Sequence, residues 1–172
     1  MNILNRLVAD MQLMFRRPTR MQYAALCHRR REGSDALEIL LITSRDTGRW
    51  VIPKGWPMEG RTAAEAAAQE AFEEAGVKGT VEDDMIGTYQ YQKGLDHGVK
   101  VPCVVAVHPL LVSQMVSKFK EKGKRRLEWV TPEEAVNRVE EPELKALIRK
   151  FAADAPLAPS PATPSRKSTK AA

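Results

Sequence analysis

Hydrophobic residues near the N-terminus recur at the spacing of a helix. Within residues 2–15 apolar side chains repeat every three or four positions, with arginines at the edges. This pattern predicts an amphipathic helix in a separate N-terminal segment, residues 1–19. Its polar face carries Asn, Gln and Asp beside a single Arg, which favours packing on the domain or on a second subunit over lying on a membrane surface.

Further along the chain the pattern changes to that of strands. Residues 22–29 and 37–43 are apolar segments on either side of a polar loop and predict two strands, the second of the fully buried type. Four more strands are expected, with Pro102 and Pro109 disturbing the hydrogen-bond ladder of the third of them. Their ranges are 50–52, 78–91, 99–111 and 126–130.

Helical patterns with clear ends stand between and after these strands. Thr62 is a favourable N-cap, Glu65 completes a capping box, and Gly76 suits the left-handed residue that follows a helix. Two further helices are predicted, one beginning at Thr131 and one over residues 143–152. On the first helix the residues expected to face inward are Ala64, Ala68, Ala71, Phe72 and Ala75.

The last twenty residues differ in composition from the rest. Residues 153–172 are rich in Pro, Ala and Ser and hold little to bury, which predicts a disordered tail. Arg166, Lys167 and Lys170 would allow weak contact with nucleic acid, although a solvated tail is the favoured interpretation. Residues 20–152 are then left as one domain, and the mixed order of strands and helices predicts an α/β fold.

Composition narrows the class of protein. The chain is 43% hydrophobic and 28% charged, and no apolar run approaches the roughly 20 residues of a membrane span. No secretory signal is visible. Cys27 and Cys103 lack metal-type spacing, so we expect buried free thiols and a cytoplasmic location. The net charge of +5 is compatible with a polyanionic ligand but is not evidence for one.

Three glutamates on the first predicted helix lie on one arc of its surface. Glu70, Glu73 and Glu74 are three and four positions apart, where like charges destabilise a helix, and they lie close to the negative end of its dipole. A divalent cation would reverse both penalties, and Mg²⁺ prefers carboxylate and carbonyl oxygens. A solvated acidic face is the ordinary alternative for the glutamates alone. The turn at residues 53–55, placed between a strand and this helix, favours the cation site.

Residues 50–77 resemble the signature of the Nudix hydrolase family: Gly, five residues, Glu, seven residues, then Arg-Glu-apolar-any-Glu-Glu-any-Gly-apolar. Gly55 takes the first position, whereas Arg61 and Gln69 stand where the family has Glu and Arg. The later positions are matched by Glu70, Ala71, Glu73, Glu74, Gly76 and Val77. The likeness is strong here and weaker over residues 22–151. It implies an α/β/α sandwich with a central mixed sheet.

The same resemblance implies hydrolysis of a pyrophosphate bond with Mg²⁺ or Mn²⁺. It implies Glu70 and Glu74 as the principal metal ligands, with the carbonyl of Lys54 or Gly55 as a further one. Glu73, a third candidate ligand, is our predicted general base. A non-catalytic Nudix-fold ligand-binding module is the alternative that the two departures favour, but such a module has no need for three metal-binding glutamates.

The residues around the signature bear on the substrate. Residues 73–80 and the Ser44-Arg45 turn resemble the branch with diphosphoinositol polyphosphate phosphohydrolases, enzymes that also cleave diadenosine polyphosphates. That resemblance implies phosphate-binding roles for Arg20, Ser44, Arg45, Lys124 and Arg125. Trp56 could close one side of the pocket. Removal of pyrophosphate from RNA 5′ ends is an alternative, favoured by the basic run 118–126.

Arg61 and Gln69 together support one more hypothesis. Gln69 can donate a hydrogen bond but brings no charge, and Arg61 could supply the missing positive charge by pairing with a box carboxylate or by reaching a substrate phosphate. The two departures would then be a paired exchange. A solvated Arg61 is the alternative.

Overall fold

The computed structural model describes residues 18–95 and 98–155, so the predicted N-terminal helix and all but the first residues of the predicted tail lie outside it. In this part of the chain eight strands form one sheet. They are β1 (Arg20–Arg30), β2 (Leu37–Thr43), β3 (Trp50–Val51), β4 (Lys54–Gly55), β5 (Val77–Val81), β6 (Gly87–Gly94), β7 (Lys100–Met115) and β8 (Leu127–Val130).

Strand β1 is at the centre of the sheet. It runs parallel to β7 and antiparallel to β2 and β4, and the remaining pairs are antiparallel, so the sheet is mixed. The main path is β3-β2-β1-β7-β5, with β6 beside β7 and β8 beside β2. The short strand β4 pairs Gly55 with Tyr23 of β1. This pairing fixes the turn before the signature helix against the centre of the sheet.

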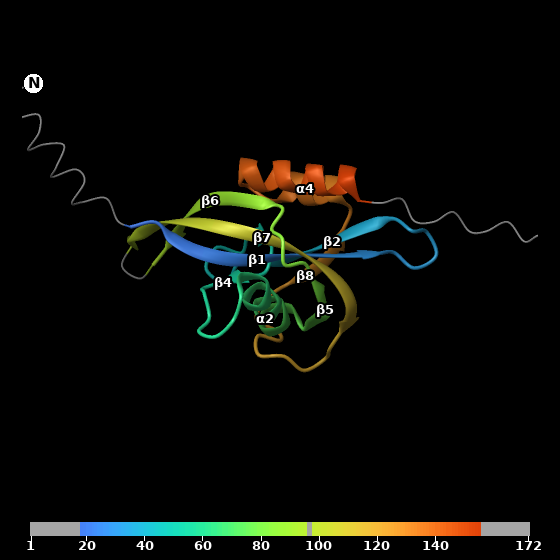
Figure 1. Ribbon diagram of the computed structural model, residues 1–172, viewed down its shortest axis with the longest axis horizontal. Helices are drawn as coiled ribbons and strands as arrows, with labels where there is room; N and C mark the ends of the chain where they lie inside the picture. Colours follow the sequence, from blue (N-terminus) through green and yellow to red (C-terminus); the bar gives the residue numbers. More distant parts are fainter. Residues whose placement is uncertain (1–17, 96–97, 156–172) are drawn as a thin grey trace, which may run out of the picture.

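Helices cover both faces of the sheet. Helix α2 (Ala63–Ala75) lies on one face, and α3 (Pro132–Arg138) and α4 (Pro142–Asp154) pack with the core of the other (Figure 1). The predicted ends of α2 are confirmed: Thr62 and Glu65 exchange both capping-box hydrogen bonds, and Gly76 has φ 69°. Thr131 caps α3 in the same way.

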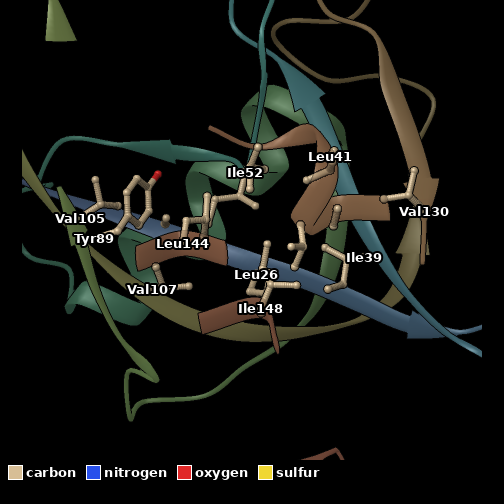
Figure 2. Packing of buried hydrophobic residues seen from close by; sticks show 14 residues of the cluster. Leu26, Ile39, Leu41, Ile52, Tyr89, Val105, Val107, Val130, Leu144 and Ile148 are labelled. Carbon is tan, nitrogen blue, oxygen red and sulfur yellow. The ribbon is translucent and has the colours of Figure 1, made fainter. Parts of the chain in front are cut away.

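The core consists of two hydrophobic layers that alternate along β1. Ala24 and Leu26 face the layer completed by Leu144 and Ile148 of α4 (Figure 2). Ala25 and Cys27 face the other layer, which the alanines of α2 complete. Successive side chains of a strand point to opposite faces, so a single buried strand supports both helical layers. The predicted α/β/α sandwich is confirmed, and both cysteines are buried and free.

Several predicted boundaries were wrong. The predicted strand 78–91 is two strands, β5 and β6, which pair with successive parts of β7 and are separated by residues 82–86. Pro109 lies opposite this break, where β7 needs no N–H donor, so the strand continues through the proline. The helix predicted over 143–152 extends to Asp154, so the predicted tail boundary at 153 falls inside α4.

The inward face of α2 is rotated slightly from the predicted one. Ala66 and Ala67 are fully buried, whereas Ala68 and Phe72 are only partly buried. Among the described residues no helix has the length and apolar character needed to cross a membrane.

Candidate active site

A polar pocket of about 190 Å³ opens beside the acidic face of α2. It lies where α2 meets β4 and the loops that follow β2 and β7. Seven of the predicted site residues line it: Ser44, Arg45, Lys54, Gly55, Glu70, Glu74 and Arg125. The pocket therefore unites two of the three signature glutamates with the turn that precedes their helix.

Gly55 and Glu70 are in direct contact. A Cβ atom on Gly55 would lie 2.0 Å from Oε1 and 2.1 Å from Cδ of Glu70. The carboxylate thus occupies space that only a glycine leaves open. Burial, followed by the negative charges of Glu74 and Glu73, raises the pKa of Glu70 to about 7.

Glu74 is buried, although its position on the acidic arc of the predicted helix gave no sign of burial. Only 7% of the residue is exposed, and its carboxylate accepts a hydrogen bond from the backbone N–H of Lys54 at 3.1 Å. Arg125 forms an ion pair with it. Burial raises the pKa of Glu74, and the positive charges of Arg125 and Lys54 oppose that rise.

Arg125 is committed to protein oxygens at all three guanidinium nitrogens. Besides its contact with Glu74, its Nε donates to Glu121 at 2.6 Å and its Nη1 to the carbonyl of Thr43 at 2.9 Å. Its side chain is 8% exposed. These contacts make Arg125 an anchor for the Glu74 carboxylate, in place of the phosphate-binding group that was predicted.

Glu73 lies outside the pocket lining. Gln69 donates a hydrogen bond to its Oε1 at 2.9 Å, and the Lys120 ammonium contacts its Oε2 at 2.6 Å. The Lys120 contact and then that of Gln69 hold the pKa of Glu73 below its usual range. The backbone N–H of Glu121 also donates to the Glu73 carbonyl at 3.0 Å. The loop after β7 is therefore fastened to the acidic face of α2.

The other predicted site residues are more dispersed. Arg20 is exposed at the start of β1, with its guanidinium 5.8 Å from the centre of the Trp56 ring. Arg45 lines the pocket and forms an ion pair with Glu121 at 3.3 Å. Lys124 is exposed and does not line the pocket.

Arg61 lies on another part of the surface. It is exposed and lines a separate hollow with Gln69 and Glu65, and within the described residues it forms no ion pair with a signature carboxylate. The positive charge of Arg61 is the smallest of the causes given for the lowered pKa of Glu73.

Several residues of this pocket were not predicted from the sequence. Tyr91 and Lys93 of β6 and Gln22 of β1 also line it, and the Tyr91 hydroxyl donates to Gln22 at 2.6 Å. Glu121 lies in the run that was interpreted only as basic. The spacing of Tyr91 and Lys93, two residues apart, was the available signal, because such residues share a strand face.

Lys54, which is half-buried, brings a cation to the pocket. Its Nζ lies 5.2 Å from the centre of the Tyr91 ring. Burial lowers the pKa of Lys54 to about 8, although the nearby Glu74 acts in the opposite direction.

The donors present suit a hard divalent cation. The half-buried Glu70 and the buried Glu74 bring two carboxylates to one pocket, and burial is the largest cause of the raised pKa of each. Carboxylate oxygens are the preferred ligands of Mg²⁺ and suit Mn²⁺. In residues 18–95 and 98–155 no group of three or more His, Cys, Asp or Glu residues is arranged to hold a metal. Glu73 is in contact with Lys120.

The chain is similar in sequence and fold to known proteins. The model of the NUDIX domain matches residues 20–154. Nudix hydrolase 16, mitochondrial, from Arabidopsis thaliana is 33% identical over 124 residues, which is 70% of this chain and 68% of that protein. Diphosphoinositol polyphosphate phosphohydrolase 3-beta from Bos taurus is 29% identical over 116 residues, 66% of this chain and 65% of that protein. The chain spans 52% and 51% of two other Arabidopsis relatives.

A solved structure of similar fold is the Ap4A hydrolase from C. elegans. It has a TM-score of 0.56 and 21% identity, and the match covers 79% of this chain and 98% of that one. At this identity the likeness concerns the fold alone. Together with the domain match, this likeness confirms the predicted fold. The domain match and the related hydrolases confirm the predicted enzyme class. The chain belongs to the Nudix hydrolase family.

Proposed function

We propose that this protein is a Mg²⁺- or Mn²⁺-dependent pyrophosphohydrolase whose substrate is a diphosphoinositol polyphosphate or a diadenosine polyphosphate. The observation that carries the proposal is a pair of carboxylates, the half-buried Glu70 and the buried Glu74, which contact the turn at Gly55 and Lys54. The same pocket carries cations from Arg45, Lys54 and Lys93. A polar pocket with both kinds of charge is suited to a metal-bound phosphate chain.

Each protein group has a defined part in this scheme. Glu70 and Glu74 would hold the metal, which supplies charge neutralisation and lowers the pKa of bound water. Arg125 fixes Glu74, and Gly55 leaves the space that the Glu70 carboxylate fills. Glu73 remains our predicted base: Lys120 keeps its carboxylate ionised, as a proton acceptor requires, but that contact has to open before Glu73 reaches the pocket.

The cations of the pocket and the names of the relatives support the substrate class. Arg45, from the loop after β2, and Lys93, from β6, both line the pocket, and Arg20 adds a charge beside Trp56. Trp56 is 36% exposed and has Arg20 and Lys93 each 5.8 Å from its ring. Arg and Lys suit dense phosphate charge. One relative is named as a diphosphoinositol polyphosphate phosphohydrolase.

Two alternative functions are less well supported. The basic run that favoured an RNA 5′ end is partly used within the protein, since Lys120 and Arg125 contact Glu73 and Glu74. A non-catalytic binding module gives no reason for placing the Glu70 carboxylate beside Glu74, where burial and then the negative charges of Glu74 and Glu73 raise its pKa.

Turnover of a substrate panel tests the proposal. Diphosphoinositol polyphosphate, diadenosine tetraphosphate and 5′-triphosphorylated RNA should be compared with Mg²⁺, with Mn²⁺ and with excess chelator. We expect turnover of the first two with metal only, and a loss of at least 100-fold in Glu70→Gln and Glu74→Gln, about 2.7 kcal/mol in transition-state stabilisation. The exposed Glu133→Gln is the matched control. Full turnover in chelator would overturn the mechanism.

A further inference from the structure

A wide groove lies apart from the active-site pocket. His28 and Arg30, near the end of β1, line it, whereas Gln22 near the start of that strand lines the active-site pocket. The groove has a volume of about 890 Å³, and the two hollows share no lining residue. Whatever occupies the groove is therefore separate from the residues of the proposed function.

The walls of the groove are mostly apolar. They come from the start of β2, residues 82–86, β7 and the last turns of α4, and their apolar members are Leu37, Met85, Ile86, Pro109, Leu111 and Phe151. Met85 is 55% exposed and Leu111 is 52% exposed, although both side chains are large and apolar. Exposed apolar side chains gathered at one hollow mark a site of interaction, and methionine adapts its shape to a partner. The groove therefore has the character of a docking site.

One segment of the sequence has a matching surface. Within residues 2–15 the predicted helix has one face of large apolar side chains, and such a face needs a partner. Its members are Ile3, Leu4, Leu7, Val8, Met11, Met14 and Phe15. Residues 156–172 begin directly after Ala155 of the groove wall, but Leu157 is their one large apolar residue. A single leucine cannot fill a groove of this volume, so the N-terminal segment is the better match.

The N-terminal segment is long enough to reach the groove of its own chain. At about 3.3 Å per residue along β1, His28 in the groove wall is about 26 Å from Arg20. A helix over residues 2–15 is about 21 Å long, and residues 16–19 can extend by about 14 Å. The combined length exceeds the distance to His28, which leaves room for the chain to turn back at the start of β1.

The charges at the groove also favour this segment. The lining holds three carboxylates and two cations. Asp83 and Asp84, beside it, are exposed and form no ion pair among the described residues. This acidic rim is a local exception in a chain whose net charge is +5. Residues 1–19 hold three arginines and one aspartate, so docking brings opposite charges together, which favours one partner over others.

We propose that residues 2–15 dock as an amphipathic helix in this groove of their own chain, with their apolar face against Met85, Leu111 and Phe151. The docked helix covers the two exposed apolar side chains and brings its arginines near the acidic residues 82–84. Docking here is independent of the proposed function, because the groove and the active-site pocket are separate.

Oxidation of methionine by hydrogen peroxide tests whether the groove is covered. Met85 lies in the groove, and Met115, which is 39% exposed outside it, is the internal control. Mass spectrometry should show Met85 of the full chain oxidised about tenfold more slowly than in the double variant Leu7→Asp with Met11→Asp, because burying the new carboxylates is costly and prevents docking. Met115 should react equally in both. Equal Met85 rates in the parent and the double variant would overturn the proposal.

Further variants identify the occupant. Asn5→Asp adds a carboxylate to the polar face of the same predicted helix and should leave Met85 protected, as in the parent. Leu157→Asp should also leave it protected, and loss of protection there would assign the groove to the C-terminal tail. Protection should persist over a hundredfold dilution, and its loss on dilution would assign the groove to a second copy of the chain. Either of these losses would overturn the proposal.

Discussion

Replacing Gly55 with alanine should damage the active site and leave the fold intact. The new methyl group would lie 2.0 Å from Oε1 of Glu70, whereas non-bonded heavy atoms rest about 3.5–4.0 Å apart. One of the two groups has to move by about 1.5 Å. The Glu70 carboxylate ends a flexible side chain, and Gly55 has no positive φ that an alanine would strain. The carboxylate should therefore be the group that moves.

The expected magnitudes follow from that displacement. Turning one side chain aside should change the free energy of unfolding by no more than about 1 kcal/mol, which corresponds to a shift in Tm of about 2–4 °C for a domain of this size. Loss of a metal-binding carboxylate from its place should lower turnover about 100-fold, or about 2.7 kcal/mol. Thermal melts, Mn²⁺ titrations and initial rates on diadenosine tetraphosphate measure the three effects.

Gly79→Ala should do the opposite of Gly55→Ala: it should lower stability and leave the active site intact. Its Cβ would lie 2.0 Å from the carbonyl oxygen of Leu111, a backbone atom held in the pairing of β5 with β7. Overpacking of this kind costs about 1–3 kcal/mol, so Tm should fall by several degrees. Turnover per folded molecule should not change, because Gly79 does not line the pocket.

The two variants together can refute the reasoning. Turnover of Gly55→Ala within threefold of the parent would show that the Glu70 carboxylate is not needed at this place. A fall in Tm larger than that of Gly79→Ala would show that the side chain cannot move aside.

Three further predictions concern other parts of the chain. Arg61→Ala should lower turnover less than threefold, because Arg61 lies outside the pocket; a loss of more than tenfold, recovered by Arg61→Glu combined with Gln69→Arg, would restore the paired-exchange hypothesis. Burial, and then Arg30, lowers the pKa of His28 to about 4, so the stability contributed by its neutral form is complete above pH 6.5 and is lost as the pH falls towards 4. In the parent, the free energy of unfolding measured with urea should fall by about 2 kcal/mol between pH 6.5 and pH 4 because of His28, and His28→Gln should remove this fall. The same pH dependence in parent and variant would show that His28 is not its cause. Truncation after Ala155 should leave Tm and turnover unchanged, because residues 156–172 offer little to bury; a fall of several degrees in a melt would show that they dock.

Local chemistry explains why the signature helix was predicted so well. Its ends depend on Thr62, Glu65 and Gly76, whose preferences act within a few residues. The burial of Glu74 could not be predicted in this way, because it depends on Arg125, which is 51 residues further along the chain. Tertiary contacts determined this orientation, and they also turned Glu73 towards Lys120.

The pocket on β6 escaped prediction for a related reason. In the sequence, Tyr91 and Lys93 have the pattern of ordinary strand residues. Their place at the pocket becomes visible only in the structure, where Gln22 of β1 accepts a hydrogen bond from the Tyr91 hydroxyl. The acidic run at residues 82–84 was treated as a local interruption, although it marks the break between two strands that pair with β7. Spacing within a segment predicts its own geometry, but not which distant segment lies beside it.

The links that hold the active site together also constrain how the protein folds. Glu74 contacts Arg125 across 51 residues, Tyr91 contacts Gln22 across 69, and Arg49 contacts Glu141 across 92. Forming each of these contacts brings together residues that are far apart in the chain, which costs conformational entropy. Such long-range contacts slow folding. A partly folded chain therefore lacks a working pocket, however well its signature helix has formed. Loss of activity on heating should accompany cooperative unfolding of the whole domain, with no active fragment surviving it.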